Sequence, residues 1–141
     1  MSTLSMKPAK QLAILMQNQP GMLARACEAI SEAGVEIEAL ATEAGSFGAR
    51  GDEVLVRMVV TDEAKAVEAL GKTGAMAIET DVLRIEGGNQ PGMLTKIAVR
   101  LARFHINIES LYVSATSDSA RCVVIVRPSD VEMTMRVLAD L

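Results

Sequence analysis

Asn18-Gln19-Pro20-Gly21-Met22-Leu23 recurs letter for letter as Asn89-Gln90-Pro91-Gly92-Met93-Leu94 in this 141-residue chain, an offset of 71 residues (89 − 18). The same offset relates apolar residues on both sides of the motif: Leu12 and Ile14 match Leu83 and Ile85, and Ile37 and Leu40 match Ile108 and Leu111. Such a long identity in register, with flanking matches, indicates a tandem duplication. The chain is therefore expected to contain two modules of one fold, residues 10–80 and 81–141.

Each copy begins with the same two expected elements. Alternating apolar residues predict a strand before the motif, and a helix is expected to start at Pro20 or Pro91, because a proline at the first helical position loses no hydrogen bond. Gly34 is expected to end the first of these helices. Apolar residues recur at helical spacing in both copies: Leu23, Ala26, Cys27 and Ile30 in the first, and Leu94, Ile97, Ala98 and Leu101 in the second.

The rest of each copy predicts two strands and another helix. Second strands are expected from Val35 and from Ile106, and the alternation slips at 37–40 and again at 108–111, which predicts a β-bulge or burial on both faces. β-Branched residues predict third strands at 54–60 and 122–126. The helix that follows is expected at 62–70 in the first copy, and in the second it is expected to open with Ser129 and Glu132 as a capping box.

This order predicts the α+β class, with two ferredoxin-like βαββαβ modules in tandem and helices on one face of each antiparallel sheet. A further short strand is expected at 76–78 in the first copy, whereas the chain stops directly after the last helix of the second copy. The second module is therefore expected to lack its fourth strand. Because modules this small bury little surface alone, we expect them to pair, or the chain to form a dimer.

Composition excludes several classes of function. The net charge is −4, and Phe47, Phe104 and Tyr112 are the only aromatic residues, so neither a basic field nor a stacking surface for nucleic acid is expected. RNA-recognition modules share the βαββαβ order, but they need aromatic residues on the first and third strands, and here those strands have none. Apolar runs are too short to span a membrane or to form a signal peptide.

Histidine and cysteine are too scarce to suggest a metal site or a catalytic centre. His105 is the only histidine; it aligns with Gly34 and is interpreted as a loop residue. Cys27 and Cys122 lack the spacing of metal ligands or of a disulfide framework, so we interpret them as reduced core thiols of a cytoplasmic protein. No cofactor, metal or catalytic residue is predicted. The glycine-containing loop at 45–51 is interpreted as a flexible hairpin connection, with a lid over a ligand as the alternative.

The repeated turn is the predicted ligand site. A helix N-terminus offers free N–H groups to a carboxylate, and Gly21 and Gly92 let a ligand approach the backbone. Asn18 and Asn89 offer both donors and acceptors to a zwitterion. Apolar walls would come from Met22, Leu23, Met93 and Leu94. The alternative is that the motif is only a favourable strand-to-helix turn.

The repeated motif, the βαββαβ order and Ile106-Asn107-Ile108 resemble the ACT domain, a small regulatory module that binds amino acids. The second half resembles the serine-binding domain of phosphoglycerate dehydrogenase, which carries Asn-x-Pro-Gly-x-Leu at the turn and Asn-Ile in the second strand. The stretch 107–111 is also similar to the small subunit of acetohydroxyacid synthase. Together these likenesses cover nearly the whole chain.

The resemblance implies a ligand between paired modules, one supplying the asparagine of its turn and the other the asparagine of its second strand. Asn18, Gly21 to Leu23, Asn107 and Ile108 would then form one complete site. The first copy has Glu36 where the second has Asn107, so binding at the site that contains Asn89 stays open.

The resemblance also implies a function. The chain would be a non-catalytic, homodimeric regulatory protein that senses a free amino acid and modulates a partner. The alternative is a regulatory subunit assembled on an amino-acid biosynthetic enzyme such as acetohydroxyacid synthase.

Overall fold

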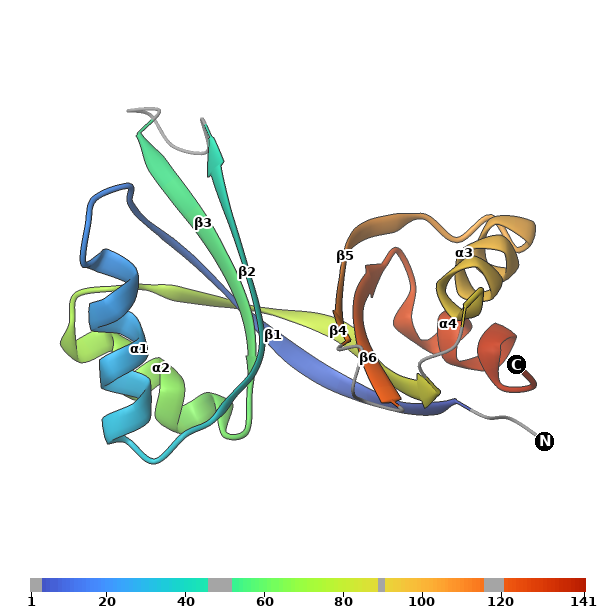
Figure 1. Ribbon diagram of the computed structural model, residues 1–141, viewed down its shortest axis with the longest axis horizontal. Coiled ribbons are helices and arrows are strands. Elements are labelled where there is room, and N and C mark those ends of the chain that lie inside the picture. The colour runs from blue at the N-terminus through green and yellow to red at the C-terminus, as the bar shows by residue number, and fades with distance from the viewer. Residues whose placement is uncertain (1–3, 46–51, 89–90, 116–120) are drawn as a thin grey trace. The chain divides into compact units, whose positions relative to one another are not determined.

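The computed structural model describes residues 4–45, 52–88, 91–115 and 121–141 (Figure 1). The chain divides into two compact units. The first unit is Lys10–Thr80, and the second combines Asp81–Leu141 with Met1–Ala9. The elements in chain order are β1 (Ser5–Gln17), α1 (Met22–Glu32), β2 (Ile37–Gly45), β3 (Glu53–Val60), α2 (Glu63–Lys72), β4 (Ala77–Gly88), α3 (Met93–Arg103), β5 (Ile108–Ala115), β6 (Arg121–Pro128) and α4 (Val131–Leu138).

Each unit contains a four-stranded sheet of the ferredoxin-like order. In the first unit the order is β2-β3-β1-β4, and in the second it is β1-β4-β6-β5. The pairs β1–β3, β2–β3, β4–β6 and β5–β6 are all antiparallel. The α+β class and the two βαββαβ modules are thereby confirmed.

The fourth strand of the second module comes from the beginning of the chain. As predicted, no strand follows α4 in the part of the chain that the structure describes. The first residues of β1 belong to the second unit and occupy the position beside β4, and Leu4 and Met6 pack against that unit's core. The fourth strand of the second unit is thus supplied by residues that precede the first copy.

One predicted boundary between two strands is wrong. The short strand expected at 76–78 and the strand expected around Leu83 form a single strand, β4, whose residues through Thr80 belong to the first unit and whose residues from Asp81 belong to the second. The sequence between them has neither a glycine nor a proline to break the extended backbone. β1 is shared between the units in the same way.

Each unit has its own hydrophobic core, to which both helices and the strands contribute. Leu12, Ile14 and Ile30 are fully buried in the first core, and Leu83, Ile85 and Leu101 in the second. In Figure 1, α1 lies next to α2, the pair that closes the first core.

The buried stripe of the first helix in each unit differs from the predicted one. Leu23 and Leu94 are 37% and 41% exposed, and Cys27 is only half-buried. Met22 and Met93, one residue before the two leucines, face the cores instead. The stripes therefore repeat every four residues, from Met22 through Ala26 to Ile30 and from Met93 through Ile97 to Leu101. Cys122 is buried, as predicted.

Both predicted slips in the second strands are β-bulges. The register against the neighbouring strand shifts between Ile37 and Ala39 in β2 and between Ile108 and Ser110 in β5. Glu38 and Glu109 are the extra residues at these shifts. A bulge in both copies, at positions 71 residues apart, is a feature of the duplicated module.

The capping-box prediction for the last helix is wrong by one residue. Asp130 is the N-cap of α4, and its side chain accepts a hydrogen bond from the backbone N–H of Met133 (2.9 Å). The helix starts later than expected because the hydroxyl of Ser129 accepts a hydrogen bond from the N–H of Asn107 instead (3.1 Å). Asp62 caps α2 in the same way (3.1 Å to Lys65 N).

The first helices of the two units end in the same turn with different residues. Gly34 (φ 77°) ends α1 as predicted, and His105 (φ 56°) takes the left-handed position after α3. Val35 and Ile106 then donate backbone hydrogen bonds to Ile30 and Leu101 at 3.1 and 2.9 Å. This is the Schellman motif, in which glycine is the favoured residue.

We expect opposite stability changes at these two positions. Gly34→Ala forces a side chain into the left-handed region and should lower the free energy of unfolding by about 1 kcal/mol, whereas His105→Gly removes such a strain and should raise it by a similar amount. Urea denaturation measures both. No atom lies within 4 Å of a Cβ built on Gly34, so a much larger loss in Gly34→Ala would contradict a purely conformational cause.

Candidate functional site

The repeated turn is a type II turn followed by a helix. The N–H of Met22 donates to the carbonyl of Gln19 (3.3 Å), and Gly21 has φ 88° and ψ −11°. Gly92 has φ 90° and ψ −3°. Contrary to the prediction, Pro20 and Pro91 therefore lie in the turn and do not begin the helices, because proline followed by glycine fits a type II turn better.

Glycine is needed at these two positions because of the backbone conformation, and not because neighbouring atoms leave no room for a side chain. A positive φ at this position strains any residue with a Cβ. No atom lies within 4 Å of a Cβ built on Gly21 or Gly92. The space beside both glycines is thus open, as a ligand that approaches the backbone would need.

The helices that follow the two turns begin without a side-chain cap. Among the described residues, no side-chain hydrogen bond caps α1 or α3, and neither helix has an acidic residue in its first turn. In contrast, α2 and α4 have aspartate caps and also carry Glu63 and Glu132 in their first turns. Within the described part of the chain, the N-terminal N–H groups of α1 and α3 therefore have no side-chain acceptor and keep their partial positive charge.

In the first unit, residues of the motif line a hollow of about 190 Å³. Asn18 is exposed, and its backbone N–H is bonded to the carbonyl of Asp52 (2.9 Å). Sequence reasoning missed the opposite wall, which lies on β2 and β3, far from the motif in sequence. The lining residues are Met16, Gln17, Asn18, Gln19, Met22, Leu23, Thr42, Val54 and Val56.

A second hollow of about 200 Å³ in the same unit is also lined by Met22. Asn18 does not line it, whereas Arg25 does. The remaining lining residues come from the end of β1, from α1 and from the turn after α2: Leu15, Met16, Gln17, Met22, Ala26, Thr73, Gly74 and Ala75.

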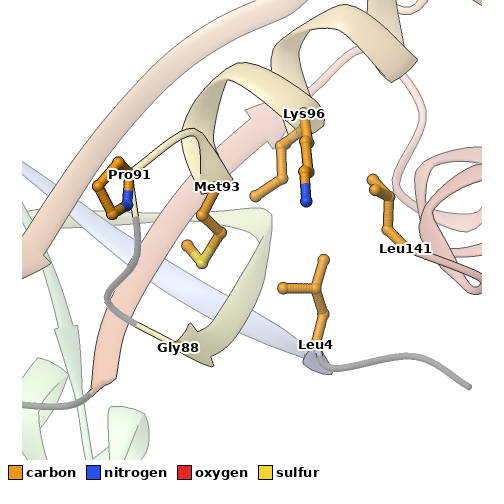
Figure 2. A pocket seen from close by; sticks show the side chains of 7 residues that line it. Leu4, Gly88, Pro91, Met93, Lys96 and Leu141 are labelled. Carbon is orange, nitrogen blue, oxygen red and sulfur yellow. The ribbon is translucent and has the colours of Figure 1, made fainter.

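In the second unit, the turn borders a hollow of about 110 Å³. Figure 2 shows the side chain of Met93 and the amino group of Lys96 directed into the space that Leu4 and Leu141 border. Leu94 is exposed and does not line it. Asn89, the predicted polar residue of this copy, lies outside the described residues.

The structure holds Asn107 and Glu36 in equivalent positions. The N–H of Asn107 donates to the hydroxyl of Ser129 and its carbonyl accepts from Ser129 N, at 3.1 and 2.9 Å. Glu36 makes the same two bonds with Thr61, both at 3.0 Å. Both side chains are exposed, and Ile108 packs against the second core. The sequence signal for this clamp is a hydroxyl residue directly before each capping aspartate.

The ion pairs lie apart from the turns. Arg84 and Arg121 each hydrogen-bond Glu86 (3.2 Å), and these bonds lower the pKa of the Glu86 carboxyl. The hydrogen bond from Arg100 lowers the pKa of Asp140 in the same way (2.6 Å). These carboxyls therefore stay ionised as structural partners of arginine. The described residues contain no cluster of three metal-ligating side chains and no helix that could cross a membrane.

Comparison with known proteins places this geometry in a family. A family model described as "ACT domain pair" matches residues 6–140. The chain belongs to this family. No match was found among curated protein sequences.

Solved structures repeat the ACT-domain-pair fold. The chain is similar to protein BT0572 from Bacteroides thetaiotaomicron, with 29% identity, a TM-score of 0.83 and coverage of 95% of this chain and 88% of that one. It is also similar in fold to the regulatory subunit of aspartate kinase from Thermus thermophilus, with 23% identity, a TM-score of 0.67 and coverage of 96% and 94%. The likeness to phosphoglycerate dehydrogenase and acetohydroxyacid synthase stays a prediction.

Proposed function

We propose that this ACT domain pair is a non-catalytic regulatory protein that binds a free amino acid at its repeated turn. The observation that carries the proposal is the start of α1 and α3, where a glycine with open space beside it precedes a helix that no side chain of the described residues caps. Because the other two helices are capped by aspartate, the difference is specific to the repeated motif.

The first unit offers a zwitterionic amino acid three kinds of contact. The N–H groups at the start of α1 would bind its carboxylate, and the amide oxygen of Asn18 would accept from its ammonium group. Met22 and Leu23 would contact its side chain in the hollow of about 190 Å³. This volume is smaller than that of sites for drug-sized ligands, about 300–1,000 Å³, and therefore suits a single amino acid.

Asn107 and Ile108 are proposed to complete the site that contains Asn18, as the resemblance to the ACT domain implies. The backbone clamp on Asn107 supports this role, because it fixes the position from which the side chain starts. Glu36 starts from the same position in the first unit and is an acid. The site that contains Asn89, Gly92, Met93 and Leu94 is therefore proposed to bind more weakly.

The proposed output is a change in the affinity for a partner. A ligand shifts a conformational equilibrium only by binding one state more tightly than the other, and such coupling is typically about 1–3 kcal/mol. The similarity in fold to a regulatory subunit of aspartate kinase supports a second candidate, a homodimeric cytoplasmic subunit that regulates an amino-acid biosynthetic enzyme. Co-purification with such an enzyme distinguishes this subunit from a free sensor.

A thermal-shift screen with the twenty amino acids tests ligand binding. A ligand present at 100 times its dissociation constant should stabilise the protein by about 2.7 kcal/mol. Titration calorimetry on the active compound should then show weaker binding in Asn18→Ala and Asn107→Ala, by about tenfold for the loss of one hydrogen bond to a charged group. Glu68→Ala on the exposed face of α2 is the control. A flat screen, or loss of binding only in Asn89→Ala, would contradict the proposed site.

A further inference from the structure

The two hollows of about 200 and 110 Å³ are equivalent parts of the duplicated module. Each is bordered by the first turns of its unit's first helix and by the chain that follows the unit's second helix. The cations that line them, Arg25 and Lys96, are 71 residues apart (96 − 25) and occupy the same place in α1 and α3. This cation is not part of the repeated six-residue motif, and the proposed amino-acid site does not use it.

Both cations are placed unfavourably for helix stability. Each is the fourth residue of its helix, where the partial positive charge of the helix end repels a cation. Neither first turn contains an acidic residue. Within the described part of the chain, neither the guanidinium of Arg25 nor the amino group of Lys96 makes an ion pair or hydrogen bond. Both side chains are exposed to solvent, so the lack of an ion pair is not costly in itself. The observation that points to an anionic ligand is that both copies place a cation beside the equivalent hollow.

The residues that line the hollow in the first unit also limit the chemistry and the size of the rest of the ligand. Its walls include the aliphatic side chains of Leu15, Met22 and Ala75, and the hydroxyl of Thr73 already donates to the carbonyl of Leu70 (2.6 Å). No acidic side chain lines it, so the ammonium group of an amino acid would have no ionic partner there. An apolar cavity of about 150 Å³ holds one benzene molecule, so this space suits a ligand of similar size.

We propose that the hollow beside Arg25 binds a short aliphatic monocarboxylate, with the carboxylate on the guanidinium and the aliphatic part against Leu15 and Ala75. Arginine can bind a carboxylate through two parallel hydrogen bonds. The hollow beside Lys96 is the smaller equivalent in the second unit and accepts a smaller anion of the same class. This binding is separate from the proposed amino-acid site and does not depend on it.

The test compares 3-methylbutanoate with its neutral isostere, 3-methylbutanamide, by NMR of methyl-labelled protein. The carboxylate should shift the methyl resonances of Leu15 and Ala75, which line this hollow and not the Asn18 hollow. It should leave the methyl resonances of Val54, which lines the Asn18 hollow, unchanged. The amide should have no effect on any of the three. Arg25→Met keeps the aliphatic part of the side chain and should weaken binding at least about tenfold, whereas Arg25→Lys should restore part of it.

Two control variants show whether binding depends on Arg25 itself. Lys65→Met removes an exposed cation on α2 of the same unit and should leave binding unchanged, as should Asn18→Ala. Equal shifts with acid and amide, or full binding in Arg25→Met, would overturn the proposal. Shifts of Val54 that disappear in Asn18→Ala would also overturn it, because the carboxylate would then occupy the amino-acid site.

Discussion

Deletion of residues 1–9 is expected to unfold the second unit, although these residues precede the first copy of the duplicated sequence. Leu4 and Met6 are partly buried against the second core, and two such side chains would contribute about 3–6 kcal/mol if fully buried, so that their partial burial contributes less than this. The deletion also removes the backbone hydrogen bonds of a strand, about 1 kcal/mol each. The total is comparable to the stability of a whole domain, about 5–15 kcal/mol.

Hydrogen exchange measures this effect segment by segment. In the deletion variant, protection should be lost in β6 and α3, whereas α1, α2 and β3 should keep theirs because Lys10–Gln17 of β1 remain. Met6→Asp should reproduce a large part of the loss, and Lys7→Ala, at an exposed position of the same strand, should have little effect. Full protection of β6 in the deletion variant would show that the N-terminal strand is dispensable.

This strand marks the limit of what the duplication predicts. The repeat establishes two βαββαβ modules, because identical motifs and matching apolar positions dictate identical elements. It contains no information about residues outside the repeat, such as Leu4 and Met6. Only the three-dimensional structure shows that β1 extends past the first unit.

The errors at helix starts have a common physical cause. Pro20, Ser129 and the glycine of each turn are all compatible with more than one local structure, and the sequence pattern favours the helical one. In the structure, Pro20 and Gly21 adopt a type II turn, and the hydroxyl of Ser129 accepts a hydrogen bond from the N–H of Asn107, the residue directly before β5. A competing hydrogen bond, made to a residue distant in sequence, decides the capping of α4.

The turn of the candidate site can be predicted from the sequence, whereas the residues that line the rest of the hollow cannot. The open glycine and the uncapped helix follow from Pro-Gly and from the lack of an acid in the first turn of α1. Thr42, Val54 and Val56 line the same hollow only because the bulged second strand and the third strand pair beside β1. Arg25 gives no signal in the sequence, because a single basic residue on a helix is ordinary unless a hollow lies beside it.

Ile30→Ala and Leu101→Ala are expected to destabilise different units by similar amounts. The two residues are equivalent in the duplication, both are fully buried, and each lies in one of the two cores. Truncation of a fully buried isoleucine or leucine to alanine typically costs about 2–5 kcal/mol, because it adds a cavity to the lost burial. Hydrogen exchange should show the loss of protection in β3 and α2 for Ile30→Ala, and in β6 and α4 for Leu101→Ala.

The exposed neighbours Glu32→Ala and Arg103→Ala serve as controls for the two helices and should change stability by less than about 0.5 kcal/mol. Equal loss of protection in both units for either core variant would contradict two separate cores. It would mean instead that a cavity in one core destabilises the other unit equally, through β1 and β4, which supply residues to both units. A loss confined to one unit would show that the shared strands leave each core its own stability, so that a ligand bound beside α1 could stabilise the first unit without an equal change in the second.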